Sequence, residues 1–174
     1  MKHLFIGLLL SKKVQIQLKN LVHDIQLPSL KCSLPHHYHI TLIPPFIETK
    51  STPSFTELKL PEIDPFSIEF TKLSYGTSPK NPTLIWVTGS TTPHLQELYE
   101  TLHKQFAPSK KIKPNKHPFL LHTTLARFRG SPSNTLPPLY KSISISETIS
   151  QISLIESKLT TYGSLYTILS HKKI

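Results

Sequence analysis

Two stretches, HYHITLIPPF at residues 37–46 and LLHTTLARF at residues 120–128, share one pattern. Each has a histidine, a threonine two places later and then a leucine, and the two copies lie 83 residues apart. Both stretches are rich in apolar and β-branched residues, which favours strands. Because side chains at i and i+2 of a strand leave the same face, each histidine should point the same way as its threonine, while the leucine enters the core.

The segments around the two motifs follow the same order. An apolar run at residues 4–10 predicts a buried strand, and apolar residues at spacings of three and four predict a helix over residues 14–25, with Ser11 as its N-cap. In the second half, residues 84–87 predict a strand and residues 95–106 a helix. Each half therefore reads strand, helix and motif-bearing strand, which indicates a duplicated unit.

The remaining segments predict further strands. Apolar and polar residues alternate at residues 66–70, 143–145 and 152–154, and residues 159–166 resemble a hairpin with Gly163 in its turn. Sixteen prolines gather mainly within residues 44–65, 108–118 and 132–138, where we expect loops. These features predict one α+β domain over residues 1–174, built from antiparallel sheets with two helices packed outside.

Composition narrows the possible functions. The 174 residues carry a formal net charge of +10, which favours an anionic partner such as nucleic acid, a phosphate ester or an anionic membrane. The single cysteine, Cys32, allows no intramolecular disulfide or thiolate cluster and lies in no recognisable nucleophile setting. The apolar run at residues 4–10 is too short to cross a bilayer. We therefore expect a cytoplasmic monomer that does not associate with membranes.

The two motifs suit chemistry on phosphate. An imidazole and a hydroxyl about 6–7 Å apart along a strand can both reach one tetrahedral anion. Histidine has an ordinary pKa near 6.5, so one ring can accept a proton while a second ring donates one. His39 and His122 are therefore the candidate catalytic pair, with Thr41 and Thr124 as candidate phosphate-binding residues, and this chemistry requires no metal or other cofactor.

The paired motifs resemble the 2H phosphoesterase superfamily, specifically its RNA 2′,3′-cyclic phosphodiesterase branch, also called 2′-5′ RNA ligase. Supporting stretches, in the order that the family shows, are HLFIGLLL, SLPHHYHITL, TLIWVTG, KHPFLLHTTLARF and LIESKLTTYGSLYTIL. The resemblance implies two similar lobes, about 1–80 and 81–174, that exchange strands around a pseudo-twofold axis. It also implies that both motifs face a V-shaped cleft between the sheets.

The resemblance further implies the reaction and the residue roles. The substrate would be an RNA 2′,3′-cyclic phosphate end, opened to a 2′-phosphate, with reversible 2′-5′ RNA ligation as a second reaction. By family analogy His122 is the base toward water and His39 is the acid toward the 3′ oxygen, while the threonines hold non-bridging oxygens. Arg127, in the family-like HTTLAR, would also contact phosphate, provided that a bulge or twist turns it toward the cleft.

Other contacts and functions stay open at this stage. Phe46 and Tyr38 are weak candidates for stacking on a base, and the lysine-rich run between Lys104 and Lys116 could follow an RNA backbone. Alternatives to the RNA reaction are a phosphodiesterase on a small cyclic nucleotide or cyclic ADP-ribose phosphate, and an RNA-binding protein without catalysis. A metal site at residues 36–39 is disfavoured, since no acidic or thiol partner lies nearby in the sequence.

Overall fold

The protein is described from a computed structural model, which covers residues 2–25, 32–35, 37–50, 52–77, 82–106, 118–128, 136, 138–161 and 163–174. Its described elements are, in chain order, β1 His3–Leu9, α1 Lys12–Asp24, β2 Cys32–Ser33, β3 His39–Ile47, the 3-10 helix η1 Phe55–Glu57, β4 Phe66–Gly76, β5 Leu84–Gly89, α2 Pro93–Phe106, β6 Leu121–Phe128, β7 Tyr140–Ile149, β8 Gln151–Thr160 and β9 Gly163–Lys173.

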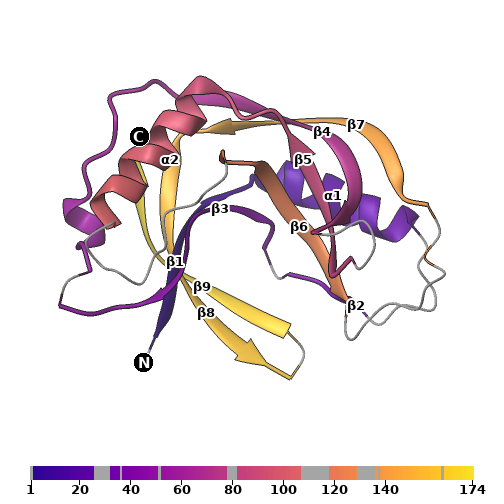
Figure 1. Ribbon diagram of the computed structural model, residues 1–174, viewed down its shortest axis with the longest axis horizontal. Helices are drawn as coiled ribbons and strands as arrows, with labels where there is room; N and C mark the ends of the chain where they lie inside the picture. The colour runs from indigo at the N-terminus through magenta and orange to yellow at the C-terminus, as the bar shows by residue number, and fades with distance from the viewer. Residues whose placement is uncertain are drawn as a thin grey trace.

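The strands form two sheets in which every described pairing is antiparallel. The first has the order β3-β1-β8-β9, and the second has the order β2-β6-β5-β4-β7. Figure 1 shows the two sheets side by side, with the β8–β9 hairpin in yellow below β3. The α+β class with antiparallel sheets and two helices is thereby confirmed.

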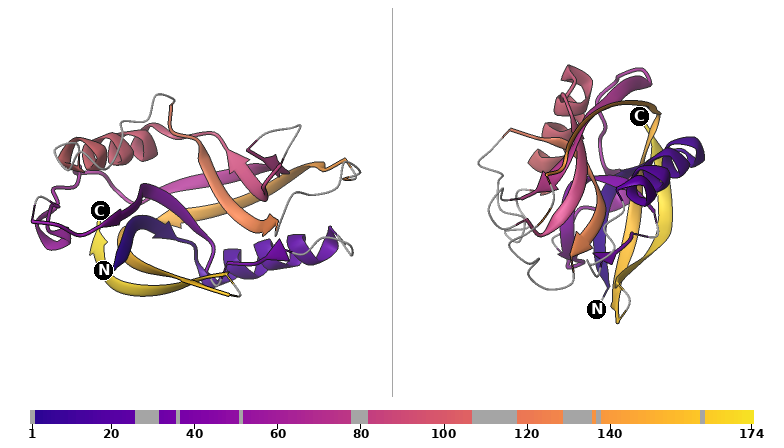
Figure 2. Two further views of the ribbon diagram at one scale, coloured as in Figure 1. Left: turned by 60° about the horizontal axis from the view of Figure 1, so that its bottom comes forward. Right: turned by 90° about the vertical axis from the view of Figure 1, so that its right-hand side faces the viewer.

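The two sequence halves interleave. Strand β4 comes from the first half but pairs with β5 and β7, while β8 and β9 come from the second half and extend the sheet of β1 and β3. The helices also cross over, since α1 contacts β6 and β7 whereas α2 contacts β3 (Figures 1 and 2). Neither half therefore buries its apolar surface alone, and the core is continuous across both sheets.

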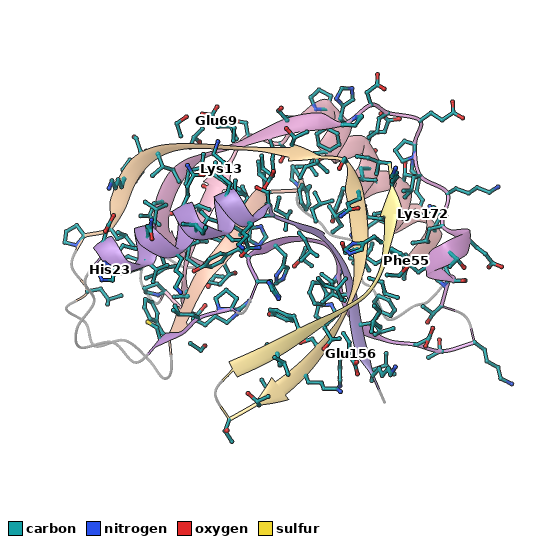
Figure 3. All side chains as sticks on the ribbon, turned by 180° about the vertical axis from the view of Figure 1, so that it is seen from behind. Lys13, His23, Phe55, Glu69, Glu156 and Lys172 are labelled. Carbon is teal, nitrogen blue, oxygen red and sulfur yellow. The ribbon has the colours of Figure 1, made fainter. Side chains whose placement is uncertain are left out.

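Helix α1 forms as its sequence pattern predicts. The Ser11 hydroxyl accepts a hydrogen bond from the Val14 backbone N–H, which caps the helix. The carboxylate of Glu147, on β7, accepts a bond of 2.5 Å from the Ser11 N–H, and a negative charge is favourable at this end of a helix. Lys13 and His23 lie on the outside of the helix (Figure 3), whereas Val14 and Leu18 are buried.

The last strand, β9, contacts the short helix η1 near the C-terminus of the chain. The Lys172 ammonium donates to the backbone oxygen of Thr56, 2.8 Å away, and Figure 3 shows Lys172 close to Phe55. Phe55 belongs to η1 and packs in the core.

The predicted hairpin around residues 159–166 is present as β8 and β9, with Thr160 opposite Gly163. This hairpin forms one wall of the site described below.

One predicted boundary is wrong. We expect the strand that starts at His39 to end before Pro44, yet β3 continues through Pro44 and Pro45 to Ile47. Strand β3 is an edge strand with β1 as its neighbour, so a missing N–H can be tolerated there. The register with β1 also shifts between Leu4 and Ile6, which places a bulge at the two prolines. The other two proline clusters lie mostly outside the described residues.

Candidate active site

The two His-x-Thr motifs occupy matching positions in β3 and β6. On β3 the register with β1 passes from Thr41 directly to Ile43, so Leu42 is an extra residue in a bulge. On β6 the register with β5 passes from Thr124 directly to Ala126, so Leu125 is an extra residue in the same way. Both strands therefore carry a bulge one residue after the threonine, so the two halves share this irregularity as well as the sequence motif.

A pocket of about 180 Å³ lies between the sheets at these motifs. Its lining residues come from the β8–β9 hairpin and β3 on one side and from β6 and the chain at and after β2 on the other. Figure 1 shows where these elements lie in the fold. Its lining residues are Ser33, Leu34, Pro35, His39, Thr41, His122, Thr124, Arg127, Leu159, Ser164 and Tyr166. The structure thus brings together the five motif residues singled out in the sequence, from strands that belong to different sheets.

Arg127 reaches this pocket because of the bulge. On a regular strand, position 127 would face away from His122 and Thr124. The extra residue at Leu125 reverses the alternation, so Leu125 and Ala126 are both buried and Arg127 returns to the side of the motif. The bulge required for this placement is therefore present, and Arg127 supplies a fixed positive charge at the pocket.

Both motif histidines are oriented by the same backbone contact. The Nδ1–H of His39 donates to the carbonyl oxygen of His37, and the Nδ1–H of His122 donates to the carbonyl oxygen of Leu120, each at 2.9 Å. A carbonyl can only accept, so Nδ1 carries a proton in both rings. In a neutral ring this leaves Nε2 as the atom able to accept a proton, which is the state that a general base requires.

The surroundings of the two rings differ. His39 lies against Phe5 and Tyr166, with ring centroids 4.8 Å and 4.9 Å away, whereas His122 packs against Trp86 at 5.3 Å. Burial lowers the pKa of His39 below its usual value, and the nearby charges of Arg127, His122 and His37 lower it further, against the opposing effect of the His37 carbonyl. His39 is therefore held toward its neutral form.

Two weaker predictions are corrected by the structure. Phe46 packs in the core against Phe106, with centroids 5.2 Å apart, and Tyr38 is also buried in the core. Neither side chain lines the pocket. Positions 39 and 46 differ by an odd number, so strand alternation places Phe46 on the face opposite His39, and the two extra residues of β3, at Leu42 and at the prolines, cancel each other and leave it there.

Tyr166, which the sequence did not single out, is the aromatic ring that lines the pocket. It comes from β9, more than a hundred residues after His39, so its position depends on the pairing of β8 with β1. Ser164 and Leu159 reach the pocket on the same hairpin. The hairpin itself was predicted, but no local signal says that it faces the two motifs.

The sequence also raises a metal site at residues 36–39, an RNA-binding run of lysines and the question of a membrane span. Within the described parts of the chain, no three His, Cys, Asp or Glu side chains converge as metal ligands. Of the lysine-rich run, Lys104 lies in the last turn of helix α2, while Lys110, Lys111, Lys113 and Lys116 lie outside the described residues, as does His36. Neither described helix has the length and apolar composition that a membrane span needs.

A duplicated α+β fold that brings one His-x-Thr motif from each half to a single pocket is the arrangement expected of 2H phosphoesterases. The family model described as the 2′-5′ RNA ligase superfamily matches residues 15–160. The chain therefore belongs to the 2′-5′ RNA ligase superfamily.

Individual relatives agree with this assignment. The RNA 2′,3′-cyclic phosphodiesterase of Aquifex aeolicus (strain VF5) is 26% identical in an alignment 176 residues long, gaps included, that covers 94% of this chain and 93% of the relative. The structure of TT0787 from Thermus thermophilus matches with a TM-score of 0.80 at 20% identity, covering 98% of this chain and 97% of that one. E. coli LigT complexed with 3′-AMP matches with a TM-score of 0.76 at 19% identity, covering 99% and 98%. These two structures share the fold.

Proposed function

We propose that this protein hydrolyses the 2′,3′-cyclic phosphate at an RNA 3′ end to a 2′-phosphate, without a metal ion. The observation that carries the proposal is the meeting of two His-x-Thr pairs, one from each sheet, at a single pocket. Support also comes from the superfamily, from the Aquifex relative named as an RNA 2′,3′-cyclic phosphodiesterase, and from the net charge of +10.

The reaction needs one base and one acid. A base takes a proton from water as the water oxygen attacks phosphorus, the bond from phosphorus to the 3′ oxygen breaks, and an acid gives a proton to that oxygen. The 2′ oxygen keeps its bond to phosphorus, so the product is a 2′-phosphate. If a 5′ hydroxyl takes the place of water, the same attack forms a 2′-5′ linkage with the same base and the same acid, and the two roles exchange only when that linkage is cleaved back to the cyclic phosphate.

The surroundings of His39 favour it as the base in hydrolysis. Burial and the positive charge of Arg127 lower its pKa, and its Nδ1–H is already used on the His37 carbonyl. A neutral ring with Nε2 free can accept a proton from water. This assigns the acid role to His122, which is the reverse of the assignment that the family resemblance implies.

The other pocket groups would hold the phosphate. Thr41 and Thr124 can donate hydroxyl hydrogens to non-bridging oxygens, and Arg127 can offer paired N–H donors to the charge that develops in the transition state. These groups lie on two different sheets. A phosphate between them would therefore be contacted from both sides.

The volume of the pocket limits which part of the substrate can enter it. At about 180 Å³ it is smaller than typical sites for whole small molecules, which suits a terminal cyclic phosphate whose attached chain leaves through the open side. A small cyclic nucleotide would use the same groups. Comparing kcat/KM for a short RNA with a 2′,3′-cyclic end and for a nucleoside 2′,3′-cyclic phosphate separates the two substrate classes.

The test of the proposal is incubation of both substrates with the protein in EDTA, followed by identification of the product isomer. We expect the 2′-phosphate as product and a higher kcat/KM for the RNA. A 3′-phosphate product, or no turnover of either substrate, contradicts the proposed reaction. Faster turnover of the mononucleotide would assign the site to small cyclic phosphates.

A further inference from the structure

The carbonyl groups that orient the two motif histidines are themselves held in place. The His37 carbonyl belongs to the same peptide unit as the Tyr38 N–H, and the Leu120 carbonyl belongs to the same unit as the Leu121 N–H. A peptide unit is planar, and in the trans form its C=O and N–H point in opposite directions. A group that fixes the N–H therefore fixes the carbonyl that faces the imidazole.

In the first half this group is Gln15 on helix α1. Its Oε1 accepts from the Tyr38 N–H at 2.7 Å, and its Nε2 donates to the Tyr38 carbonyl at 2.7 Å and to the Leu10 carbonyl at 3.2 Å. One amide side chain thus satisfies both backbone groups of Tyr38, the residue immediately before His39. The contact needs a donor and an acceptor together, which glutamine has and glutamate lacks.

In the second half the corresponding group is Thr91, close to the start of helix α2. Its hydroxyl oxygen accepts from the Leu121 N–H at 3.3 Å, and the hydroxyl donates to the Phe119 carbonyl at 2.8 Å. Thr91 therefore forms hydrogen bonds with the backbone on both sides of Leu120, at the Phe119 carbonyl and the Leu121 N–H. The Leu120 carbonyl between them accepts from His122. Although the two residues differ in type, each lies near the N-terminus of a helix and holds the peptide unit upstream of a motif histidine.

We propose that Gln15 and Thr91 are positioning residues for His39 and His122, each acting through the peptide unit that precedes the motif. The inference rests on the proposed function, because it assigns these residues a role in the same reaction. Each holds Nδ1 in its protonated state and aims Nε2 at the pocket. Loss of either contact lets the carbonyl turn away and frees the ring to change tautomer or rotate.

The isosteric variants Gln15→Glu and Thr91→Val test this role. In Gln15→Glu one oxygen can still accept from the Tyr38 N–H, but the other oxygen faces the Tyr38 and Leu10 carbonyls, and this repulsion displaces the side chain from the peptide unit. The variant should therefore lower kcat for cyclic phosphate hydrolysis on the order of tenfold with little change in KM, as expected when a reacting group loses alignment. Thr91→Val should do the same, while Thr91→Ser, which keeps the hydroxyl, should restore most of the rate. Nitrogen-15 NMR of the imidazole rings should show a loss of the Nδ1–H form at His39 in Gln15→Glu and at His122 in Thr91→Val.

Two matched controls separate positioning from general stability. Gln105 holds both the N–H and the carbonyl of Lys59, at 2.8 Å and 2.7 Å, far along the chain from either motif. Thr52 accepts from the Thr49 N–H at 2.9 Å. Gln105→Glu and Thr52→Val remove similar backbone contacts, and we expect both to keep wild-type kcat and both histidine tautomers.

The outcomes are distinct. Unchanged tautomers in Gln15→Glu and Thr91→Val, or an equal loss of kcat in the control variants, would overturn the positioning role. If the wild-type protein does not turn over cyclic phosphates, the proposed function fails, but the tautomer measurement still decides whether the two residues set the ring states. A change confined to the histidine downstream of each variant supports the inference in either case.

Discussion

Arg127 on β6 and His39 on β3 belong to different sheets and line the same pocket. Burial is the main cause of the lowered pKa of His39, and the positive charge of Arg127 is the next one that lowers it. This relationship depends on the bulge at Leu125, because an unbroken strand would turn Arg127 away. In the proposed mechanism it links the acid–base residue of one half to the phosphate-binding residue of the other.

Replacing Arg127 should weaken transition-state binding. Arg127→Met removes a charged donor to the phosphate, which should cost about 2 kcal/mol, or roughly 30-fold in kcat/KM. Arg127→Lys keeps the charge but not the paired donors and should recover part of the rate. The control Lys19→Met removes an exposed cation from α1 and should have no effect. A twofold or smaller change in Arg127→Met would exclude a phosphate contact.

The same variant should change the pH dependence of kcat/KM. If His39 is the base, activity falls as the pH drops through its pKa, and this acid limb should lie below pH 6.5 because burial and nearby positive charges lower that pKa. Removing the Arg127 charge raises the pKa, so the acid limb of Arg127→Met should move to higher pH. Movement of the alkaline limb alone would instead make His39 the acid.

Thr123 and Thr124 are neighbours with opposite environments. Thr123 is 1% exposed, faces away from the pocket, and its hydroxyl has no hydrogen-bond partner among the described residues. Thr123→Val should therefore raise the free energy of unfolding by about 1 kcal/mol and leave activity unchanged, since it removes an unsatisfied buried group. Urea denaturation and a rate assay check both points, and a clear loss of stability would contradict the account.

Thr124→Val is the matched change on the pocket side. It should lower kcat/KM by the equivalent of about 1–3 kcal/mol, the range for a hydrogen bond to a charged group. Thr41→Val should have a similar effect, because the two threonines occupy equivalent positions after their histidines. Wild-type kinetics in both variants would remove the hydroxyls from the phosphate site.

Much of the arrangement follows from short-range patterns. The i and i+2 spacing places each histidine with its threonine, and the 83-residue repeat places one pair in each half. Ser11 caps α1 as its residue type predicts. Such features depend on neighbours along the chain, and sequence therefore reveals them.

What sequence could not reveal depends on long-range pairing. The bulges at Leu42 and Leu125 appear only in the register with β1 and β5, and they decide that Arg127 faces the pocket. An edge position lets β3 run through Pro44 and Pro45, which local rules assign to a loop. Tyr166 reaches His39 only because β8 pairs with β1.

The most direct test of the central claim is the rate of cyclic phosphate hydrolysis in His39→Ala and His122→Ala. Both rings are expected to transfer protons in the reaction, so each variant should lose more than about 100-fold in kcat, the lower bound for losing acid–base help. His23→Ala, which removes an exposed ring on α1, serves as the control and should match the wild type. If either motif variant keeps a rate within a few-fold of wild type, paired-histidine catalysis at this pocket is contradicted.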